Sequence, residues 1–313
     1  RALRSRLWAA GALRKDLGRA HRVTRAYCDR PLGQCDVPLE TFFSLLAPCA
    51  ATQLVADAKR AAIAPVIARD PALAALPLLA CTTPYKAGGR SGPMAYTNIA
   101  PGAILFRHAA DLYPYSNGLA LLRATGAQIR EWLERAVSAY CQIVPGGDAP
   151  QRLLDPAFAS YNFDRLDGLT YRIDLSQPAR SSAEGDVIRP GPGRIRDLRR
   201  ADGREVAEDD SFLVVTNTYR AAGGGHFPAA AGCETILASV QPVREILAQH
   251  IATRPDGVTQ RAVSGFSFAP LGGTRLVYET GPAAAQHGAR AHALGLAPDG
   301  HSERGFARYL LTL

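Results

Sequence analysis

The spacing of hydrophobic residues predicts a clear amphipathic helix in the second quarter of the chain. Thr125 can cap its N-terminus, with Gln128 three residues later, as in a capping box. Beyond it, apolar residues recur at helical spacing and form one continuous stripe: Ile129, Trp132, Leu133, Ala136, Val137 and Tyr140. Trp132 and Tyr140 are therefore predicted to be core residues rather than ligand contacts.

Strands are predicted where apolar residues alternate or run together. Residues 169–176 alternate strictly, which is typical of a half-buried strand. The other strand candidates cover 118–124, 211–218, 275–280 and 306–313, and residues 76–81 form a short apolar run broken by Pro77. Helices are predicted over 242–253 and over most of 39–69, with breaks at Pro48 and Pro65. Because helices and strands interleave without a regular βαβ order, the predicted fold class is α+β, a mixed sheet with packed helices.

The positive charge of the chain is concentrated at its N-terminus. The formal net charge is +8, and residues 1–26 carry eight Lys or Arg against one acid, Asp16. This leaves a nearly balanced remainder, so no nucleic-acid partner is expected. We interpret residues 1–27 as a basic linker helix with a solvated face, the alternative being a polyanion site supported by a single aromatic, Trp8. Residues 28–313 are predicted to form one domain.

The ends of the chain and its apolar runs bear on its compartment. No apolar run approaches the roughly 20 residues that a membrane span needs, so no membrane association is predicted. The chain begins at Arg1 rather than Met and opens in the middle of a pattern, which we interpret as a fragment or a processed chain. Cys28 and Cys35 lie close enough in sequence for a disulfide in an oxidising compartment; free, packed cysteines are the alternative.

The sequence lacks the residue patterns of a hydrolytic active site. A two-metal phosphoesterase needs a dense set of His, Asp and Asn ligands. Of the motifs D-x-H, G-N-H and G-H-x-H only the first occurs, once, as Asp299-Gly300-His301 in a predicted polar turn, and we interpret it as a chance match. No G-x-S-x-G motif and no C-x-x-C pair is present. No catalytic and no metal-binding residue is therefore predicted in this chain.

Two segments centred on aromatic residues suggest a binding site. They are "SYNFDRLDGLTYRIDLSQPAR" at 160–180 and "VVTNTYRAAGGGHFP" at 214–228. In the second, an apolar strand leads into Asn217, Tyr219 and Arg220 and then into three consecutive glycines, Gly223 to Gly225. Glycine lets the backbone approach a ligand closely. A stacking platform is one interpretation of this pattern, and a structural turn with a core tyrosine is the other.

Six blocks, in order, are similar to the C-terminal domain of bacterial 2',3'-cyclic-nucleotide 2'-phosphodiesterase/3'-nucleotidases, within the wider 5'-nucleotidase family. The blocks are "HRVTRAYCDRPLG" (21–33), "TTPYKAGGR" (82–90), "FRHAADLYPYSNGLALLRATGAQIREWLE" (106–134), "YNFDRLDGLTYRIDLSQPAR" (161–180), "VVTNTYRAAGGGHFP" (214–228) and "YETGPAAA…GFARYLLTL" (278–313). The resemblance covers the chain from about residue 20 onwards. It implies a 5'-nucleotidase C-terminal-domain-like fold.

The resemblance also implies the residues of a nucleoside site. The base would be stacked between Tyr161 and Tyr219, each stacking contact contributing roughly 1–3 kcal/mol. The remaining candidates are Asn162 and Asp164 for base or ribose edges, Asn217 and Arg220 beside the second ring, Gly224 in the glycine loop, and Lys86 and Arg90 for ribose or phosphate. For Arg220, pairing with Asp164 is an equal alternative. Asn117 is expected to fix a turn.

Partners and compartment follow from the same resemblance. Members of this family join such a domain to an N-terminal metallophosphoesterase domain that holds two divalent metal ions, and they act in the periplasm. Their substrates would be nucleosides, 3'-nucleotides and 2',3'-cyclic nucleotides. His226 and Phe227 after the glycines, where related 5'-nucleotidases often have an acidic residue, favour the 3'-nucleotidase branch. The isolated chain is expected to be the inactive binding half of such an enzyme; the alternative is a stand-alone, non-catalytic nucleotide-binding module.

Overall fold

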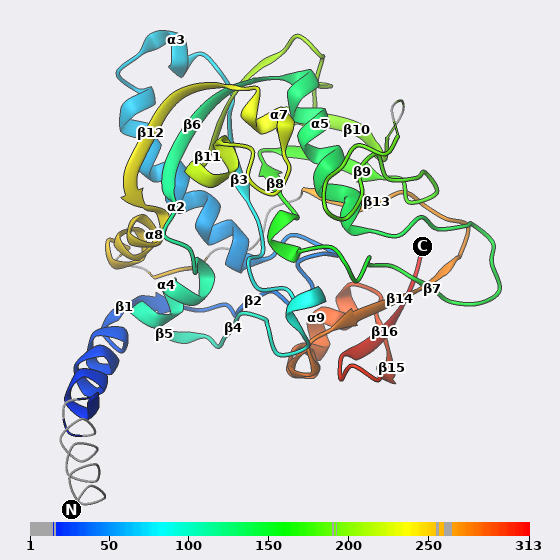
Figure 1. Cartoon of the computed structure of the whole chain (residues 1–313), viewed down its shortest axis with the longest axis horizontal. Helices are drawn as coiled ribbons and strands as arrows, with labels where there is room; N and C mark the ends of the chain where they lie inside the picture. Colours follow the sequence, from blue (N-terminus) through cyan, green and yellow to red (C-terminus); the bar gives the residue numbers. More distant parts are fainter. Residues whose placement is uncertain (1–14, 16, 190, 192, 255–256, 260–264) are drawn as a thin grey trace, which may run out of the picture.

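A computed structural model describes residues 15, 17–189, 191, 193–254, 257–259 and 265–313. A helix over residues 17–28 projects away from the rest of the molecule (Figure 1). Residues 1–14 and 16 of the predicted basic linker helix lie outside the described residues.

A five-stranded mixed sheet forms the centre of the fold. Its strands, in spatial order, are β12 (Glu234–Pro242), β6 (Gly118–Thr125), β11 (Ser211–Asn217), β3 (Leu78–Thr82) and β8 (Arg165–Asp167). β11 runs parallel to β3 and antiparallel to β6, and β8 runs antiparallel to β3. β11 is a continuous apolar run because both of its faces are covered: Phe212 and Val214 belong to one hydrophobic core, and Leu213 and Val215 belong to the other.

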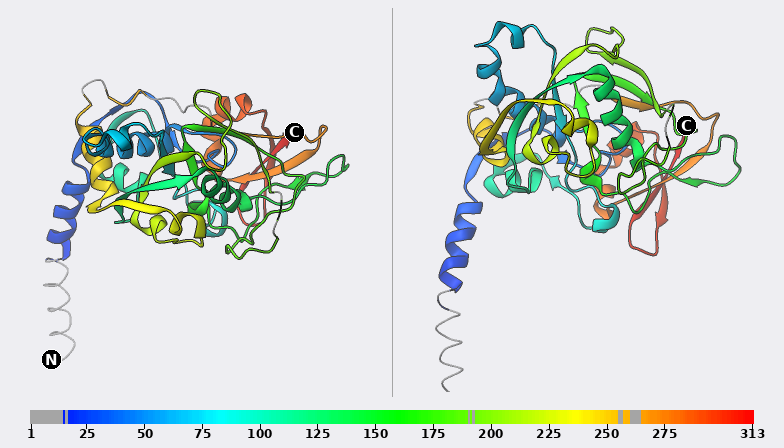
Figure 2. Two further views of the ribbon diagram at one scale, coloured as in Figure 1. Left: turned by 90° about the horizontal axis from the view of Figure 1, so that it is seen from above. Right: turned by 45° about the horizontal axis from the view of Figure 1, so that its top comes forward.

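Helices pack on both faces of this sheet (Figure 2). One core contains residues of α2 (Ala50–Ile67), α4 (Phe106–Leu112) and α8 (Val243–Ala252). The other contains the apolar stripe of α5 (Gly126–Ala136). The short helices are α3 (Pro71–Ala74), α6 (Thr218–Ala221), α7 (Pro228–Ala231) and α9 (Gly288–Ala293).

Smaller sheets extend the second core. One contains β15 (Ala297–His301), β16 (Ala307–Thr312), β14 (Arg275–Thr280) and β7 (Gln151–Arg152). Another contains β10 (Ile195–Arg200), β9 (Leu169–Ile173) and β13 (Phe266–Phe268). Two strand pairs are also present, β1 (Pro31–Cys35) with β5 (Gly102–Leu105) and β2 (Leu39–Glu40) with β4 (Asn98–Ile99). The 3-10 turns are η1 (Gly89–Ser91), η2 (Val137–Ala139), η3 (Ser160–Asn162) and η4 (Pro282–His287).

The main sequence predictions for secondary structure are confirmed. The mixed α and β content matches the predicted α+β class. α5 begins with the capping box of Thr125 and Gln128, and Trp132 and Tyr140 are both buried. The alternation of residues 169–176 appears in β9, although the strand ends at Ile173.

Three predictions of secondary structure were wrong: a helix over 41–49, a helix break at Pro65 and a turn at 299–301. Residues 41–49 contain turns rather than helix, and α2 starts only at Ala50 and continues through Pro65 to Ile67. Pro65 lies in the last turn of α2 and is exposed. Proline has no N–H to donate to the carbonyl of Ala61, but Ala61 is also exposed, so the helix tolerates the lost hydrogen bond. The polar turn predicted around Asp299-Gly300-His301 is instead part of β15.

All six cysteines are free, including Cys28 and Cys35. Within the described part of the chain, no helix is long and apolar enough to cross a bilayer.

Candidate functional site

Four loops meet at one edge of the central sheet. Because β3 and β11 are parallel while β6 and β8 run against them, the carboxyl ends of the first two strands and the amino ends of the other two share this edge. Each connection carries a tyrosine: Tyr85 after β3, Tyr219 in α6 directly after β11, Tyr115 before β6, and Tyr161 in η3 before β8. Side chains far apart in the sequence are thereby brought to one place.

These loops enclose an open cleft of about 220 Å³. The cleft is lined by Thr83, Tyr85, Tyr115, Asn117, Tyr161, Asn217, Tyr219 and Arg220. Tyr219 and Tyr115 are 46% and 43% exposed, which is unusual for large aromatic side chains that have a core within reach. A lining of exposed rings with a few amide groups suits a flat, polar-edged ligand.

Tyr115 and Tyr161 form a corner of the cleft. Their ring centroids lie 6.4 Å apart with an interplanar angle of 74°. The Arg90 guanidinium lies 5.6 Å from the centroid of the Tyr161 ring and donates a hydrogen bond to the Tyr161 hydroxyl. Burial, followed by the nearby phenols of Tyr161 and Tyr219, raises the pKa of Tyr115. All three rings line the same cleft, and the Tyr115 and Tyr161 rings are steeply inclined to each other.

Two glycines lie against the side chains at the Tyr219 wall of the cleft. A Cβ on Gly224 would meet the Tyr219 ring at 2.5 Å, so the ring rests directly on the backbone of this residue. A Cβ on Gly225, which has φ of +77°, would meet Asn162 and Arg220 side-chain atoms. The glycine loop thus makes close contact with protein side chains, and the Tyr219 ring needs a residue without a side chain beneath it.

The floor of the cleft is polar and neutral. Asn217 caps α6 by accepting a hydrogen bond from the Arg220 backbone N–H at 2.8 Å, and its Nδ2 donates to the Tyr85 hydroxyl at 3.3 Å. Burial raises the pKa of Tyr85 well above its usual value and that of Tyr113 beneath it to about 12. These hydroxyls therefore stay protonated at physiological pH and can act as neutral hydrogen-bonding groups.

The structure brings together only part of the predicted site. Tyr161, Asn217, Tyr219 and Arg220 line the cleft. Asn162, Asp164, Lys86, Arg90 and Gly224 are not among the lining residues. Asp164 is 1% exposed, and its carboxylate is held by Arg220 and by the Trp132 indole N–H, which donates at 2.7 Å. Lys86 is paired with Asp111 at the protein surface.

Sequence reasoning missed several lining residues. Tyr85, Tyr115 and Thr83 were not candidates, and Asn117, expected to fix a turn, also lines the cleft. The sequence offers one indication of these residues: Tyr115 and Asn117 immediately precede the predicted strand 118–124. Without the strand directions, that signal did not indicate which sheet edge these side chains share with Tyr219.

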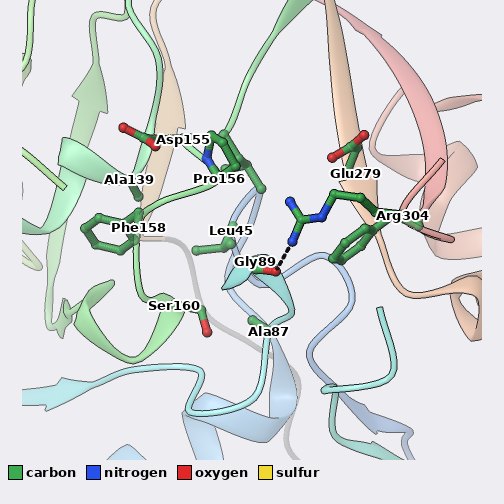
Figure 3. Close-up of a pocket in the computed structure, with 12 residues that line it drawn as sticks. Leu45, Ala87, Gly89, Ala139, Asp155, Pro156, Phe158, Ser160, Glu279 and Arg304 are labelled. Atoms are coloured by element: carbon green, nitrogen blue, oxygen red, sulfur yellow. Dashed lines mark hydrogen bonds between the residues drawn. The ribbon is translucent and has the colours of Figure 1, made fainter. Parts of the chain in front are cut away.

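A second cavity is lined in part by Ala87 and Gly89, which lie next to Arg90 in the sequence (Figure 3). Its volume is only about 30 Å³, enough for one or two water molecules and too small for a base. Arg304 reaches across it and donates a hydrogen bond to the carbonyl of Gly89 at 3.2 Å. This contact braces the loop next to Arg90 rather than forming a ligand site.

The described residues do not fit a catalytic metal centre. No group of three or more His, Cys, Asp or Glu side chains among them is placed to hold an ion.

Comparisons with known proteins place the fold in a family. The family model of the 5'-nucleotidase C-terminal domain matches residues 31–232. The 2',3'-cyclic-nucleotide 2'-phosphodiesterase/3'-nucleotidase of Haemophilus influenzae is 36% identical over 303 residues, covering 94% of this chain and 46% of that protein. The trifunctional nucleotide phosphoesterase protein YfkN of Bacillus subtilis is 35% identical over 260 residues, covering 83% of this chain and 18% of that protein.

A solved structure agrees with this assignment at the level of the fold. The 5'-nucleotidase precursor of Thermus thermophilus superposes with a TM-score of 0.58 at 18% identity, covering 84% of this chain and 43% of that one. The chain spans less than half the length of each of these relatives. On the match of the family model to most of its length, this chain belongs to the 5'-nucleotidase C-terminal domain family.

Proposed function

We propose that this chain is the nucleoside-binding half of a metal-dependent phosphoric-ester hydrolase of the 2',3'-cyclic-nucleotide 2'-phosphodiesterase/3'-nucleotidase type. The names of the curated relatives support the reaction class. The observation that carries the binding role is the open, tyrosine-lined cleft with Tyr219 nearly half exposed.

In this proposal a base stacks on the Tyr219 ring. The facing wall is the corner of Tyr161, the ring expected from sequence, and Tyr115, which the structure adds. The amides of Asn117 and Asn217 and the Tyr85 hydroxyl lie where they can bond the base edge. Because stacking tolerates every base, such a cleft suits nucleosides, 3'-nucleotides and 2',3'-cyclic nucleotides of more than one base.

Hydrolysis itself is assigned to a separate metallophosphoesterase domain that holds two divalent metal ions, in a periplasmic enzyme. The binding half contributes by orienting the nucleotide so that its phosphate reaches that centre. We expect the isolated chain, with Mn²⁺, Co²⁺ or Mg²⁺ added, not to hydrolyse bis(p-nitrophenyl) phosphate; turnover proportional to protein concentration in repeated preparations would contradict this division of roles.

Calorimetric titration of the chain with 3'-AMP tests the binding role. Tyr219→Ala should weaken binding by about 5- to 150-fold, the equivalent of one stacking contact. Tyr115→Ala and Tyr161→Ala then identify the facing ring, since the variant that removes it should lose as much affinity as Tyr219→Ala. Tyr27→Ala, which alters an exposed tyrosine outside the cleft, is the matched control. Unchanged affinity in all three cleft variants would refute the proposal.

A further inference from the structure

The buried Arg220 guanidinium connects two of the segments that build the cleft, the one before β8 and the glycine loop after β11. Its Nε and Nη2 pair with the two Asp164 carboxylate oxygens at 2.7 and 3.1 Å. Nη2 also donates to the Tyr161 carbonyl at 3.1 Å, and Nη1 donates to the Gly224 carbonyl. The residue before it in the chain is Tyr219.

Neighbouring groups fix this guanidinium in place. Its central carbon lies 3.8 Å from the centroid of the Phe227 ring. Burial alone would lower the pKa of Arg220, but the Asp164 carboxylate outweighs it and the pKa is raised, so the group is charged in the folded protein. Asp164 is held in turn by the Trp132 indole on α5. The loop network is thereby tied to a core helix.

The next turn of the glycine loop is braced in the same way. Arg135 on α5 donates through Nε to the His226 carbonyl and through Nη2 to those of Gly225 and Ala183, all at 3.2 Å. His226 has φ of +60°, a conformation that persists only where the surroundings hold it. The loop beneath Tyr219 is therefore pinned at successive carbonyls by two buried guanidiniums.

The geometry points to Arg220 as the positioning residue of the binding cleft: with Asp164 and Trp132 it sets the separation of the Tyr161 and Tyr219 walls without itself being required as a base contact. This inference rests on the proposed nucleoside function. It accounts for why Arg220, although it lines the cleft, is only 3% exposed and directs its donors into the protein. A planar fork with donors on two sides can connect the two walls, whereas the single ammonium of lysine cannot.

The test compares two buried arginines. Arg220→Lys keeps the charge and removes the fork. Arg194→Lys is the matched control, because Arg194 is also buried and also donates to backbone carbonyls, those of Gln177, Val137 and Tyr140, outside the cleft lining. We expect both variants to lower the melting temperature, but only Arg220→Lys to weaken 3'-AMP binding, by about tenfold or more. Equal affinities in the two variants would overturn the inference.

A second variant covers the case in which Arg220→Lys does not fold. Arg220→Met with Asp164→Asn removes both charges of the pair together and leaves an acceptor for Trp132, so no buried charge is stranded. It should fold and still bind 3'-AMP about tenfold or more weakly than the parent chain. Parental affinity in this double variant would equally overturn the inference.

A readout without ligand separates this inference from the proposed function. In the chain labelled at its tyrosine rings, Arg220→Lys should shift the NMR signals of Tyr161 and Tyr219, and Arg194→Lys should leave both in place. If the parent chain binds no nucleotide while these signals shift, the proposed function fails and the positioning role stands. If both signals stay in place in Arg220→Lys, the positioning role fails whatever the chain binds.

Discussion

Replacing Gly224 by alanine would displace the Tyr219 ring without straining the backbone. The added Cβ would lie 2.5 Å from ring atoms of Tyr219, well inside van der Waals contact. Gly224 does not have a positive φ, so alanine can adopt its backbone conformation. The ring is nearly half exposed and can swing outward, so we expect the free energy of unfolding to change by less than about 1 kcal/mol.

The cost should appear in binding instead. A ring that has moved off Gly224 no longer faces the corner formed by Tyr115 and Tyr161, and one stacking contact of about 1–3 kcal/mol is lost. The dissociation constant for 3'-AMP should rise about 5- to 150-fold, to the level of Tyr219→Ala.

Titration calorimetry and urea unfolding on the same samples measure both effects. Gly288→Ala is the control, because Gly288 has φ of −55° and a Cβ there would meet nothing within 4 Å. If Gly224→Ala bound 3'-AMP as tightly as Gly288→Ala while Tyr219→Ala lost affinity, the steric argument for the glycine loop would be refuted.

Two further predictions concern stability. Trp132→Ala should lower the free energy of unfolding by about 3–5 kcal/mol in urea titrations, because it empties a fully buried site and removes a hydrogen bond to Asp164; a neutral effect would mean that this side chain does not fill the core. Burial, followed by the charge of Arg254, lowers the pKa of His250 to about 4. This is below its unfolded value of about 6.5, so folding favours the neutral imidazole. The resulting contribution to the free energy of unfolding is complete above about pH 6.5 and is lost as the pH falls towards 4. The full pKa shift corresponds to about 3 kcal/mol, and the partial exposure of His250 reduces this to about 1–2 kcal/mol. His250→Gln should flatten the plot of unfolding free energy against pH over this range. Parallel plots for the variant and the parent chain would contradict the assignment.

The sequence predicted individual elements of the site better than their arrangement. The strand 211–218 and the ring at its end, Tyr219, were both identified, because a continuous apolar run has a strong local signal. Tyr115 was overlooked although it directly precedes a predicted strand. Its proximity to Tyr161 depends on β6 and β8 both running against the parallel pair of β3 and β11, and strand direction leaves no local pattern in the sequence.

The sequence also does not indicate which charged residues are buried. The sequence predicts ligand contact for Asp164 and Arg220, with pairing as an equal alternative for Arg220, and the structure shows the pair. Hydrophobic spacing cannot indicate this, because the pairing depends on a contact between residues 56 positions apart. Polar residues beside aromatic ones in a loop are compatible with either a solvated ligand site or a buried ion pair.

The buried Arg220–Asp164 pair helps to fix the exposed tyrosine rings at the sheet edge in position. Loops are the most mobile part of a fold, yet a base stacks well only if the separation of its two walls is fixed. Tyr219 contributes little burial of its own, so its position must be imposed by groups that the ligand never covers. Arg220 and Asp164 impose it from below, and Gly224 imposes it by contact. Loss of affinity in Gly224→Ala should therefore leave stability unchanged, whereas loss of affinity in Arg220→Lys should come with a lower melting temperature. If Gly224→Ala and Arg220→Lys instead had the same affinity for 3'-AMP and the same melting temperature, the contact of Gly224 with the Tyr219 ring and the Arg220–Asp164 pair could not hold Tyr219 in separate ways.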